Sequence, residues 1–184
     1  RIFTKNLYLS AKTSIPSAEE VAKMRAAMPA GPRVSPERSR KLLVFCRSWG
    51  YKPSAIPYGA KAFEIMAQQT GAFEATVTYD DTLFEPQSLK QFDAVVMNNT
   101  HEPHPWLPAD FPQLSPQQQA AAKKQEEVLK RSFLDFVAAG KGLVGIHGAT
   151  CSVRWPQYME LIGGTYGGHI TESVWVKPED AKHP

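Results

Sequence analysis

The chain has 184 residues, of which 42% are hydrophobic and 21% charged, and it carries a net charge of +3. A chain of this length suits one domain that buries about 70% of its unfolded surface. Basic and acidic residues are mixed, and no basic stripe interleaved with aromatics indicates a nucleic-acid binder. No apolar run approaches the ~20 residues that cross a bilayer, so we expect no transmembrane segment.

The sequence does not decide the cellular compartment. The first residue is Arg1 rather than Met, so a signal peptide could precede it, and we expect a soluble protein that is either cytoplasmic or exported. Cys46 and Cys151 could form at most one bridge, and each follows an apolar, strand-like run. We interpret both as buried thiols rather than as a disulfide framework.

The N-terminal part lacks a sustained hydrophobic pattern. Residues 17–28 predict one short helix, with Ser17 as its cap and Glu19 and Glu20 in its first turn. Prolines and a glycine then interrupt the chain as far as Pro36. We therefore expect an N-terminal arm and linker over residues 1–40, followed by an α/β domain over residues 41–184.

Four segments after this arm predict β-strands. Apolar runs at 41–47 and 92–97 are typical of strands that are covered on both faces of a sheet, and residues 142–147 predict a fourth strand. Residues 73–79 alternate apolar and polar side chains, which favours a strand nearer the edge.

Helical patterns separate these strands. Residues 58–70 and 156–162 predict two helices. The clearest helix begins after Ser115, which stands three residues before Gln118 in a capping-box pattern with a proline at the first helical position. Gly140 ends this helix.

Strands that alternate with helices in this way predict right-handed βαβ units and a mostly parallel sheet. We expect an α/β fold with a three-layer αβα sandwich of flavodoxin-like architecture. Ligands of such folds bind outside the carboxyl ends of the strands. This rule selects the loops at residues 48–57, 98–114, 147–155 and 163–169.

His147 is the strongest candidate for chemistry. It ends an apolar strand, with Gly145 before it and Gly148 after it, and such small neighbours permit a tight strand-to-helix turn that presents one side chain at the edge of the sheet. An imidazole there could act as a general acid or base, or ligate a metal. The alternative is a histidine that is hydrogen-bonded between layers and only orients a loop.

Amide and aromatic side chains in the selected loops could bind a ligand. Asn98, Asn99 and Thr100 end a buried strand, and amides there suit sugar hydroxyls or an oxyanion, although they equally suit capping of the following loop. Tyr51 and Trp155 could stack on a sugar ring or simply pack within the protein.

The other histidines give weaker signals. His169 follows a glycine-rich stretch, residues 163–168, which lacks the strand-before, helix-after setting of a phosphate loop, so taken alone we interpret it as a loop residue. His101 and His104 flank Pro103 and therefore lie in a loop, where a third metal ligand is not evident. We expect both of them to be exposed to solvent.

Taken together, these motifs resemble the trehalose-utilisation (ThuA-like) family, which implies the fold of the class I glutamine amidotransferase-like superfamily. The resemblance covers residues 40 to 184. It is carried by residues 40–45, 50–51, 54–61, 92–100, 140–150, 155–158, 163–164 and 168–169.

The resemblance implies a carbohydrate function. The amidotransferases hold a nucleophilic cysteine at the strand-end turn, whereas this chain has His147 there and Cys151 four residues later, so glutamine hydrolysis is not expected. The family is linked to disaccharide use through oxidised (3-keto) sugars, which implies a hydrolase or lyase acting on a disaccharide, glycoside or keto-sugar. The implied catalytic residues are His147 and His169, which would also hold a divalent metal ion if one is the cofactor. The implied sugar-binding residues are Tyr51, Asn98, Asn99, Thr100, Gly148 and Trp155.

Two departures from the family pattern keep a second function open. Pro53 stands where relatives usually have histidine, and Cys151 and Ser152 stand where relatives often have an acidic residue. The alternative is thus a non-catalytic domain that binds a sugar or a partner. The family domain continues with further strands beyond Pro184, so we expect a fragment; a homo-oligomer is also left open.

Overall fold

The structure is a computed structural model that describes residues 15–48, 51, 53–101, 103–150, 153–168 and 172–180. The strands are β1 (Arg40–Phe45), β2 (Phe73–Thr78), β3 (Ala94–Asn98) and β4 (Gly142–Ile146). The α-helices are α1 (Ala18–Ala27), α2 (Ile56–Thr70), α3 (Pro86–Leu89), α4 (Pro116–Ala138) and α5 (Pro156–Ile162). The short 3-10 helices among the described residues are η2 (Asp81–Phe84), η3 (Phe111–Gln113) and η4 (His147–Thr150).

The four strands form one sheet in the order β2-β1-β3-β4, and all three pairs are parallel. Val44 of β1 lies between Val77 of β2 and Val96 of β3, and Val96 lies opposite Val144 of β4. This order is the start of the flavodoxin-like order 2-1-3-4-5. The carboxyl ends of all four strands therefore meet at one edge, as we expected from the alternation of strands and helices.

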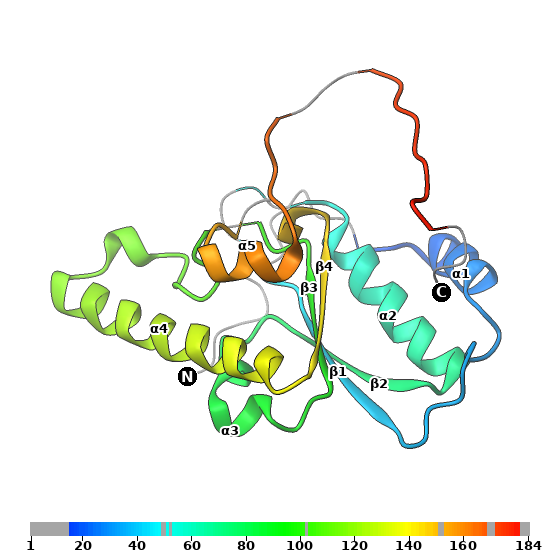
Figure 1. Ribbon diagram of the computed structural model, residues 1–184, viewed down its shortest axis with the longest axis horizontal. Coiled ribbons are helices and arrows are strands. Elements are labelled where there is room, and N and C mark those ends of the chain that lie inside the picture. The colour runs from blue at the N-terminus through cyan, green and yellow to red at the C-terminus, as the bar shows by residue number, and fades with distance from the viewer. Residues whose placement is uncertain are drawn as a thin grey trace.

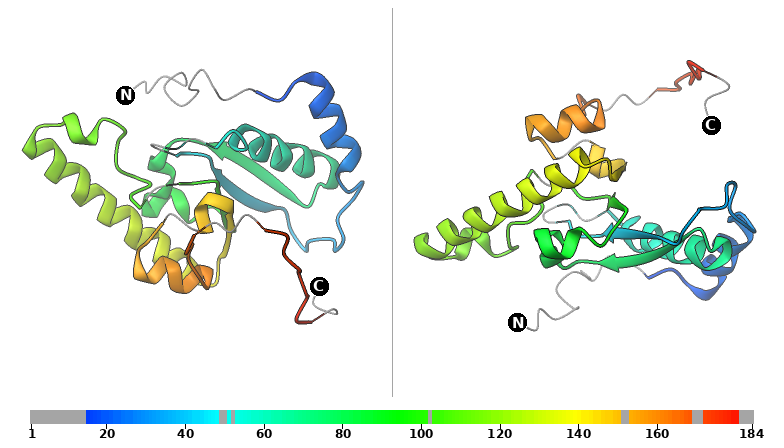
Figure 2. Two further views of the ribbon diagram at one scale, coloured as in Figure 1. Left: turned by 90° about the horizontal axis from the view of Figure 1, so that it is seen from above. Right: turned by 60° about the horizontal axis from the view of Figure 1, so that its bottom comes forward.

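Helices cover both faces of the sheet. Successive strand residues point to opposite faces, so Phe45 and Met97 pack in one core with Phe133 of α4, while Val44 and Val96 pack in a second core against α2. Figures 1 and 2 show α2 on one side of the sheet and α4 and α5 on the other. The predicted three-layer α/β architecture is confirmed.

Aromatic rings bind the loops at the carboxyl edge to α4. Trp106, from the loop after β3, has its ring centroid 5.0 Å from Phe84 and 4.9 Å from Trp155, which directly precedes α5. Phe133 of α4 lies 5.9 Å from Trp106 and stacks on Tyr158 of α5 at 6.0 Å. Such pairs contribute about 0.5–1.5 kcal/mol each beyond their buried area. The loops after β3 and β4 are thus anchored to the same helix.

The predicted helix starts carry the expected caps. Ser17 and Glu20 form a reciprocal capping box at α1, and Ser115 and Gln118 form one at α4. Helix α1 buries none of its own residues, but Glu20 also accepts a hydrogen bond of 2.7 Å from the Tyr58 hydroxyl of α2. Helix α1 therefore lies along α2 on the outside of the sandwich (Figure 1).

A carboxylate closes the opposite, amino-terminal edge of the sheet. Asp93 accepts a hydrogen bond of 2.9 Å from the backbone N–H of Lys41 and one of 3.1 Å from Arg38, and Lys141 Nζ lies 3.6 Å away. The hydrogen bond from Arg38, followed by that from Lys41, holds the pKa of Asp93 well below its usual range. This cluster fastens the start of β1 to the segments that precede β3 and β4.

Across the described parts of the chain, none of the helices combines the length and the apolar character that a membrane span requires.

Candidate functional site

A sharp turn at the end of β4 exposes His147. The strand ends at Ile146, and His147 begins η4 with a φ of +47°, a left-handed value that is uncommon for a residue other than glycine. The Thr150 hydroxyl donates to the His147 carbonyl oxygen at 2.7 Å and holds the turn. A Cβ at Gly145 would lie 2.9 Å from Cδ1 of Ile162, so a larger residue here would require the Ile162 side chain to shift. The turn has the form that the sequence predicts, and the imidazole is exposed.

Asn99 makes a matching turn at the end of β3. Its φ is +56°, and its backbone N–H donates to the Ile146 carbonyl oxygen at 3.2 Å. Its side-chain Oδ1 lies 3.0 Å from Nδ1 of His147. Left-handed backbone costs up to about 1–3 kcal/mol per residue and persists only where the surroundings impose it. Two adjacent strand ends therefore share this conformation, and their side chains are hydrogen-bonded to each other.

Asn98 fixes the orientation of this pair. It is fully buried, and its Nδ2 donates to the Ile56 carbonyl oxygen at 2.9 Å and to Cys46 Sγ at 3.2 Å. Its Oδ1 consequently accepts from Nδ2 of Asn99, at 2.9 Å. Asn99 must then turn its own oxygen toward His147, whose Nδ1 has to carry the proton. Within the described residues Nε2 of His147 accepts no hydrogen bond, so its lone pair is left for a ligand.

Gly59 makes room for this chain of amides. It lies in the first turn of α2, and a Cβ at this position would come within 2.4 Å of Asn98 Oδ1. Such an approach is far inside van der Waals contact, and backbone or amide would have to move. The sequence contains Gly59 within the stretches that resemble the family, but no local pattern shows which side chain it accommodates.

The thiol next to Asn98 is inert. Cys46 is free and only 1% exposed, and burial raises its pKa to about 12 against the opposing effect of the hydrogen bond from Asn98. The thiolate is the nucleophilic form, so Cys46 is unsuited to attack at neutral pH. The prediction of a buried thiol is confirmed for Cys46, while Cys151 lies outside the described residues.

The loops after β1 and β3 bring Tyr51 and His101 to the same edge. Ser48 Oγ donates to the Tyr51 carbonyl oxygen at 2.9 Å and accepts from the backbone N–H of His101 at 3.1 Å. The rings of Tyr51 and His101 meet edge to face at 5.3 Å. A Cβ at Gly148 would lie 3.0 Å from His101 Cδ2, so the His101 ring lies directly against the His147 turn.

The expectation that both loop histidines are exposed is half wrong. His101 is half-buried, because its ring packs on Gly148 and Tyr51. His104 has a side chain that is 54% exposed, as expected, and its Nδ1 lies 3.1 Å from the buried carboxylate of Glu126. No sequence signal separates the two, because the partners of His101 come from distant loops.

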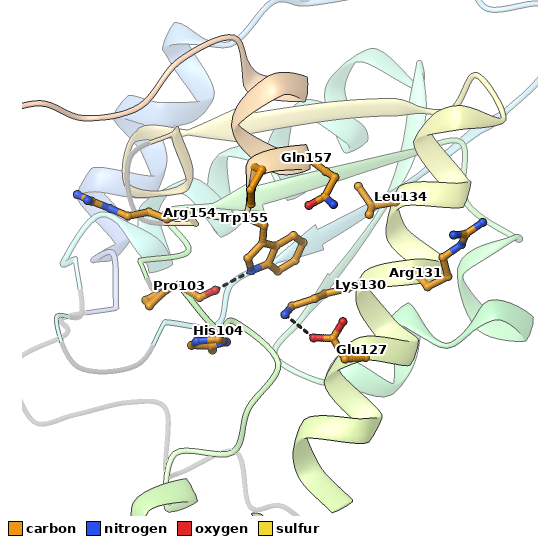
Figure 3. Close-up of a pocket in the computed structure, with 10 residues that line it drawn as sticks. Pro103, His104, Glu127, Lys130, Arg131, Leu134, Arg154, Trp155 and Gln157 are labelled. Atoms are coloured by element: carbon orange, nitrogen blue, oxygen red, sulfur yellow. Dashed lines mark hydrogen bonds and ion pairs between the residues drawn. The ribbon is translucent and has the colours of Figure 1, made fainter. Parts of the chain in front are cut away.

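Trp155 lies in a neighbouring cleft of about 520 Å³ between α4 and the start of α5 (Figure 3). Its indole is 8% exposed, and its Nε1 donates to the Pro103 carbonyl oxygen at 2.7 Å. Lys130 Nζ lies 5.2 Å from the centre of the indole and 2.7 Å from Glu127. The lining residues are Pro103, His104, Glu127, Lys130, Arg131, Leu134, Arg154, Trp155, Pro156 and Gln157.

The structure thus gathers some of the predicted residues and separates others. Asn99 is hydrogen-bonded to His147, Gly148 follows it in the turn, and the largely exposed Tyr51 side chain packs on His101, which lies against Gly148. Asn98 and Thr100 are fully buried behind them. Trp155 lines the neighbouring cleft and is linked to the loop after β3 through Pro103. His169 lies outside the described residues.

The residues that the structure describes give little support for a metal centre. Among them no group of three His, Cys, Asp or Glu side chains is placed to hold a metal ion. His147 engages Nδ1 with Asn99 and offers Nε2 as a single ligand atom. The metal site predicted with His169 stays a prediction.

The fold and the turn define a flavodoxin-like α/β protein that carries an imidazole at the strand-end turn of β4. The family model described as ThuA, trehalose utilisation, matches residues 41–184, and the chain belongs to this family. Membership connects the chain with the utilisation of trehalose and other carbohydrates. A search of the curated proteins and a search of the solved structures each gave no match.

Proposed function

We propose that this chain acts on a disaccharide, a glycoside or a keto-sugar derivative, with His147 as a proton-transferring group at the carboxyl edge of the sheet. The observation that carries the proposal is the chain of hydrogen bonds from Ile56 through Asn98 and Asn99 to Nδ1 of His147. It leaves Nε2 of an exposed imidazole unprotonated in the neutral form, which is the state of a general base.

The chemistry of a 3-keto glycoside fits such a base. The C3 carbonyl acidifies the hydrogen on C2, so a base can remove it and form an enolate. The electron pair then expels the glycosidic oxygen from C1, and that oxygen takes a proton from an acid. The products are an unsaturated keto-sugar and a free sugar; addition of water across the double bond completes hydrolysis without any change in redox state. An imidazole suits both proton transfers near neutral pH.

For the sugar contacts we propose the residues around the turn. Asn99 and Gly148 lie next to His147, and the exposed ring of Tyr51, which packs on His101 beside this turn, can cover one face of a sugar. Trp155 is proposed to contact the sugar from the neighbouring cleft. The buried residues Asn98 and Thr100 are proposed to support these contacts from behind.

For His169 we propose the role that the family resemblance implies, that of a second catalytic or metal-binding imidazole. Hydrolysis of glutamine is not proposed, because an imidazole rather than a thiol occupies the turn and the thiol of Cys46 is buried and neutral.

A second candidate is a domain that binds a sugar or a partner without turnover. The observation that favours it is Pro53, which is buried in the loop after β1 where relatives usually have histidine, so this loop places no imidazole at that position. The first proposal is preferred because an exposed side chain in a left-handed turn costs stability that simple binding does not require.

One experiment separates the two candidates. Trehalose and its 3-keto derivative are titrated by calorimetry, and release of free sugar is followed for the wild type and for His147→Ala. Turnover that is lost in His147→Ala while binding persists supports an enzyme. Binding without turnover in the wild type supports a binding domain, and the absence of both from the wild type contradicts the carbohydrate function.

A further inference from the structure

Beside His147, a second imidazole of the described chain lies at this turn, and we propose that His101 is the acid that protonates the departing glycosidic oxygen. The inference rests on the proposed function. It assigns a chemical role to a residue that the sequence led us to expect in solvent.

The loop after β1 and the turn after β4 hold His101 in place. Its backbone N–H donates to Ser48 Oγ, from the loop after β1, at 3.1 Å. Tyr51 presents the edge of its ring at 5.3 Å. Gly148, the neighbour of His147 in the chain, lies under the ring, and a Cβ there would be 3.0 Å from Cδ2 and 3.3 Å from Cβ of His101. The ring therefore abuts the His147 turn at Gly148, where a Cβ would fit only if the ring moved by a few tenths of an ångström.

The ring nitrogens of His101 are uncommitted within the described part of the chain. No hydrogen bond or ion pair reaches them there, and the groups that its packing partners present are the Tyr51 phenol and the His147 turn. His104, three residues further on, is engaged instead by the Glu126 carboxylate at 3.1 Å. The two histidines of this loop thus have different environments, and only His101 is free to exchange a proton beside His147.

The hydrogen bonds give His147 and His101 different roles. His147 has its proton fixed on Nδ1 by Asn99 and presents Nε2 as the acceptor of the C2 proton. His101, whose ring nitrogens have no such restraint, is the group that gives a proton to the oxygen that leaves C1. In one turnover His147 gains a proton and His101 loses one, and exchange with water restores both. Atoms and charges balance without a metal or a redox partner.

Substitution of His101 tests this role. In His101→Ala we expect kcat for 3-keto-trehalose to fall by about 10²–10⁴-fold, the effect of losing a positioned acid. KM should change by less than about threefold, because the proposal gives His101 no part in ground-state binding. Added imidazole should restore part of the rate. A merely structural histidine would give no such rescue.

A second variant changes the residue against which the His101 ring packs. Gly148→Ala should displace His101 and lower kcat, whereas Gly31→Ala, where a Cβ meets nothing within 4 Å, should leave kcat unchanged. If His101→Ala does not fold, as judged by circular dichroism, the wild type decides the matter through the imidazole signals of His101 on addition of 3-keto-trehalose. Signals that shift and titrate with the bound sugar support the proposal, and signals that stay unchanged overturn it.

The failures of the two proposals can be told apart. If the wild type and Gly31→Ala release sugar and His101→Ala does so at the same rate, the role of His101 is overturned and the proposed function stands. If the wild type neither binds nor cleaves the sugars, the proposed function fails and the role of His101 fails with it. Binding without turnover in the wild type also overturns an acid at this position.

Discussion

Oδ1 of Asn99 lies 3.0 Å from Nδ1 of His147, and both residues have left-handed backbone at the ends of adjacent strands. This contact joins β3 to β4 at the edge where flavodoxin-like folds bind their ligands. Since the amide of Asn98 is itself held by the Ile56 carbonyl oxygen, the tautomer of an exposed imidazole is set from inside the core.

Asn99→Asp tests the electrostatic side of this contact. A carboxylate next to the ring stabilises the protonated imidazole, so less of the free base is present at acidic pH and the acidic limb of the pH–rate profile should move to higher pH. The variant also sets two oxygens against each other at Asn98 and should lose about 1–3 kcal/mol of stability. A profile identical to that of the wild type would show that Asn99 does not act on the catalytic group.

Gly59→Ala tests whether the packing of α2 against Asn98 holds the hydrogen-bonded side-chain amides in place. Replacing a glycine by alanine in a helix normally stabilises a protein by roughly 0.5–1 kcal/mol. Here the new Cβ would meet Asn98 Oδ1 at 2.4 Å, so we expect the opposite sign, a loss of about 1–3 kcal/mol in urea denaturation, together with lower turnover. Gly31→Ala, where a Cβ meets nothing within 4 Å, is the matched control and should leave both quantities near wild type.

A comparison of His147→Gly with His147→Ala tests the strain in the turn. Both variants should lose turnover, because both lack the imidazole. Glycine adopts a φ of +47° at little cost, whereas for alanine this conformation is less favourable by about 1 kcal/mol or more. We therefore expect His147→Gly to unfold at a higher urea concentration than His147→Ala; the reverse order would mean that the turn relaxes once the imidazole is gone.

Asp93→Asn gives a stability prediction at the opposite edge of the sheet. The pKa of Asp93 is lowered in the folded protein, so its stabilising effect is complete above the ordinary carboxyl pKa of about 4 and is lost as the pH falls toward the lowered value. At pH 7 the variant should be less stable by roughly 1–2 kcal/mol, a modest amount because Arg38 is exposed. The difference from wild type should narrow between pH 5 and pH 2, and a constant difference would refute the assignment to ionisation.

Local patterns were sufficient to predict most of the fold. The capping box of Ser115 and Gln118, the alternation in β2 and the glycines around His147 each determine structure over a few neighbouring residues, and the structure has these features where they were expected. The boundaries differ by one to a few residues; α2, for example, begins at Ile56 rather than near Tyr58.

The parts of the site that could not be predicted depend on contacts between distant segments. The need for glycine at position 59 comes from Asn98, and the position of the His101 ring comes from Ser48, Tyr51 and Gly148. The short helix α3 and the half-burial of His101 likewise follow from packing rather than from local propensity. A single sequence lists these residues but does not show that they meet.

The tautomer of His147 gives the most direct test of its proposed role as the base. Long-range ¹H–¹⁵N spectra of the neutral imidazole, recorded with and without 3-keto-trehalose, distinguish a protonated Nδ1 from a protonated Nε2. We expect the proton on Nδ1 in the free protein and a change at Nε2 when the sugar is added. A proton on Nε2, or an Nε2 signal that the sugar leaves unmoved, would contradict the proposed base.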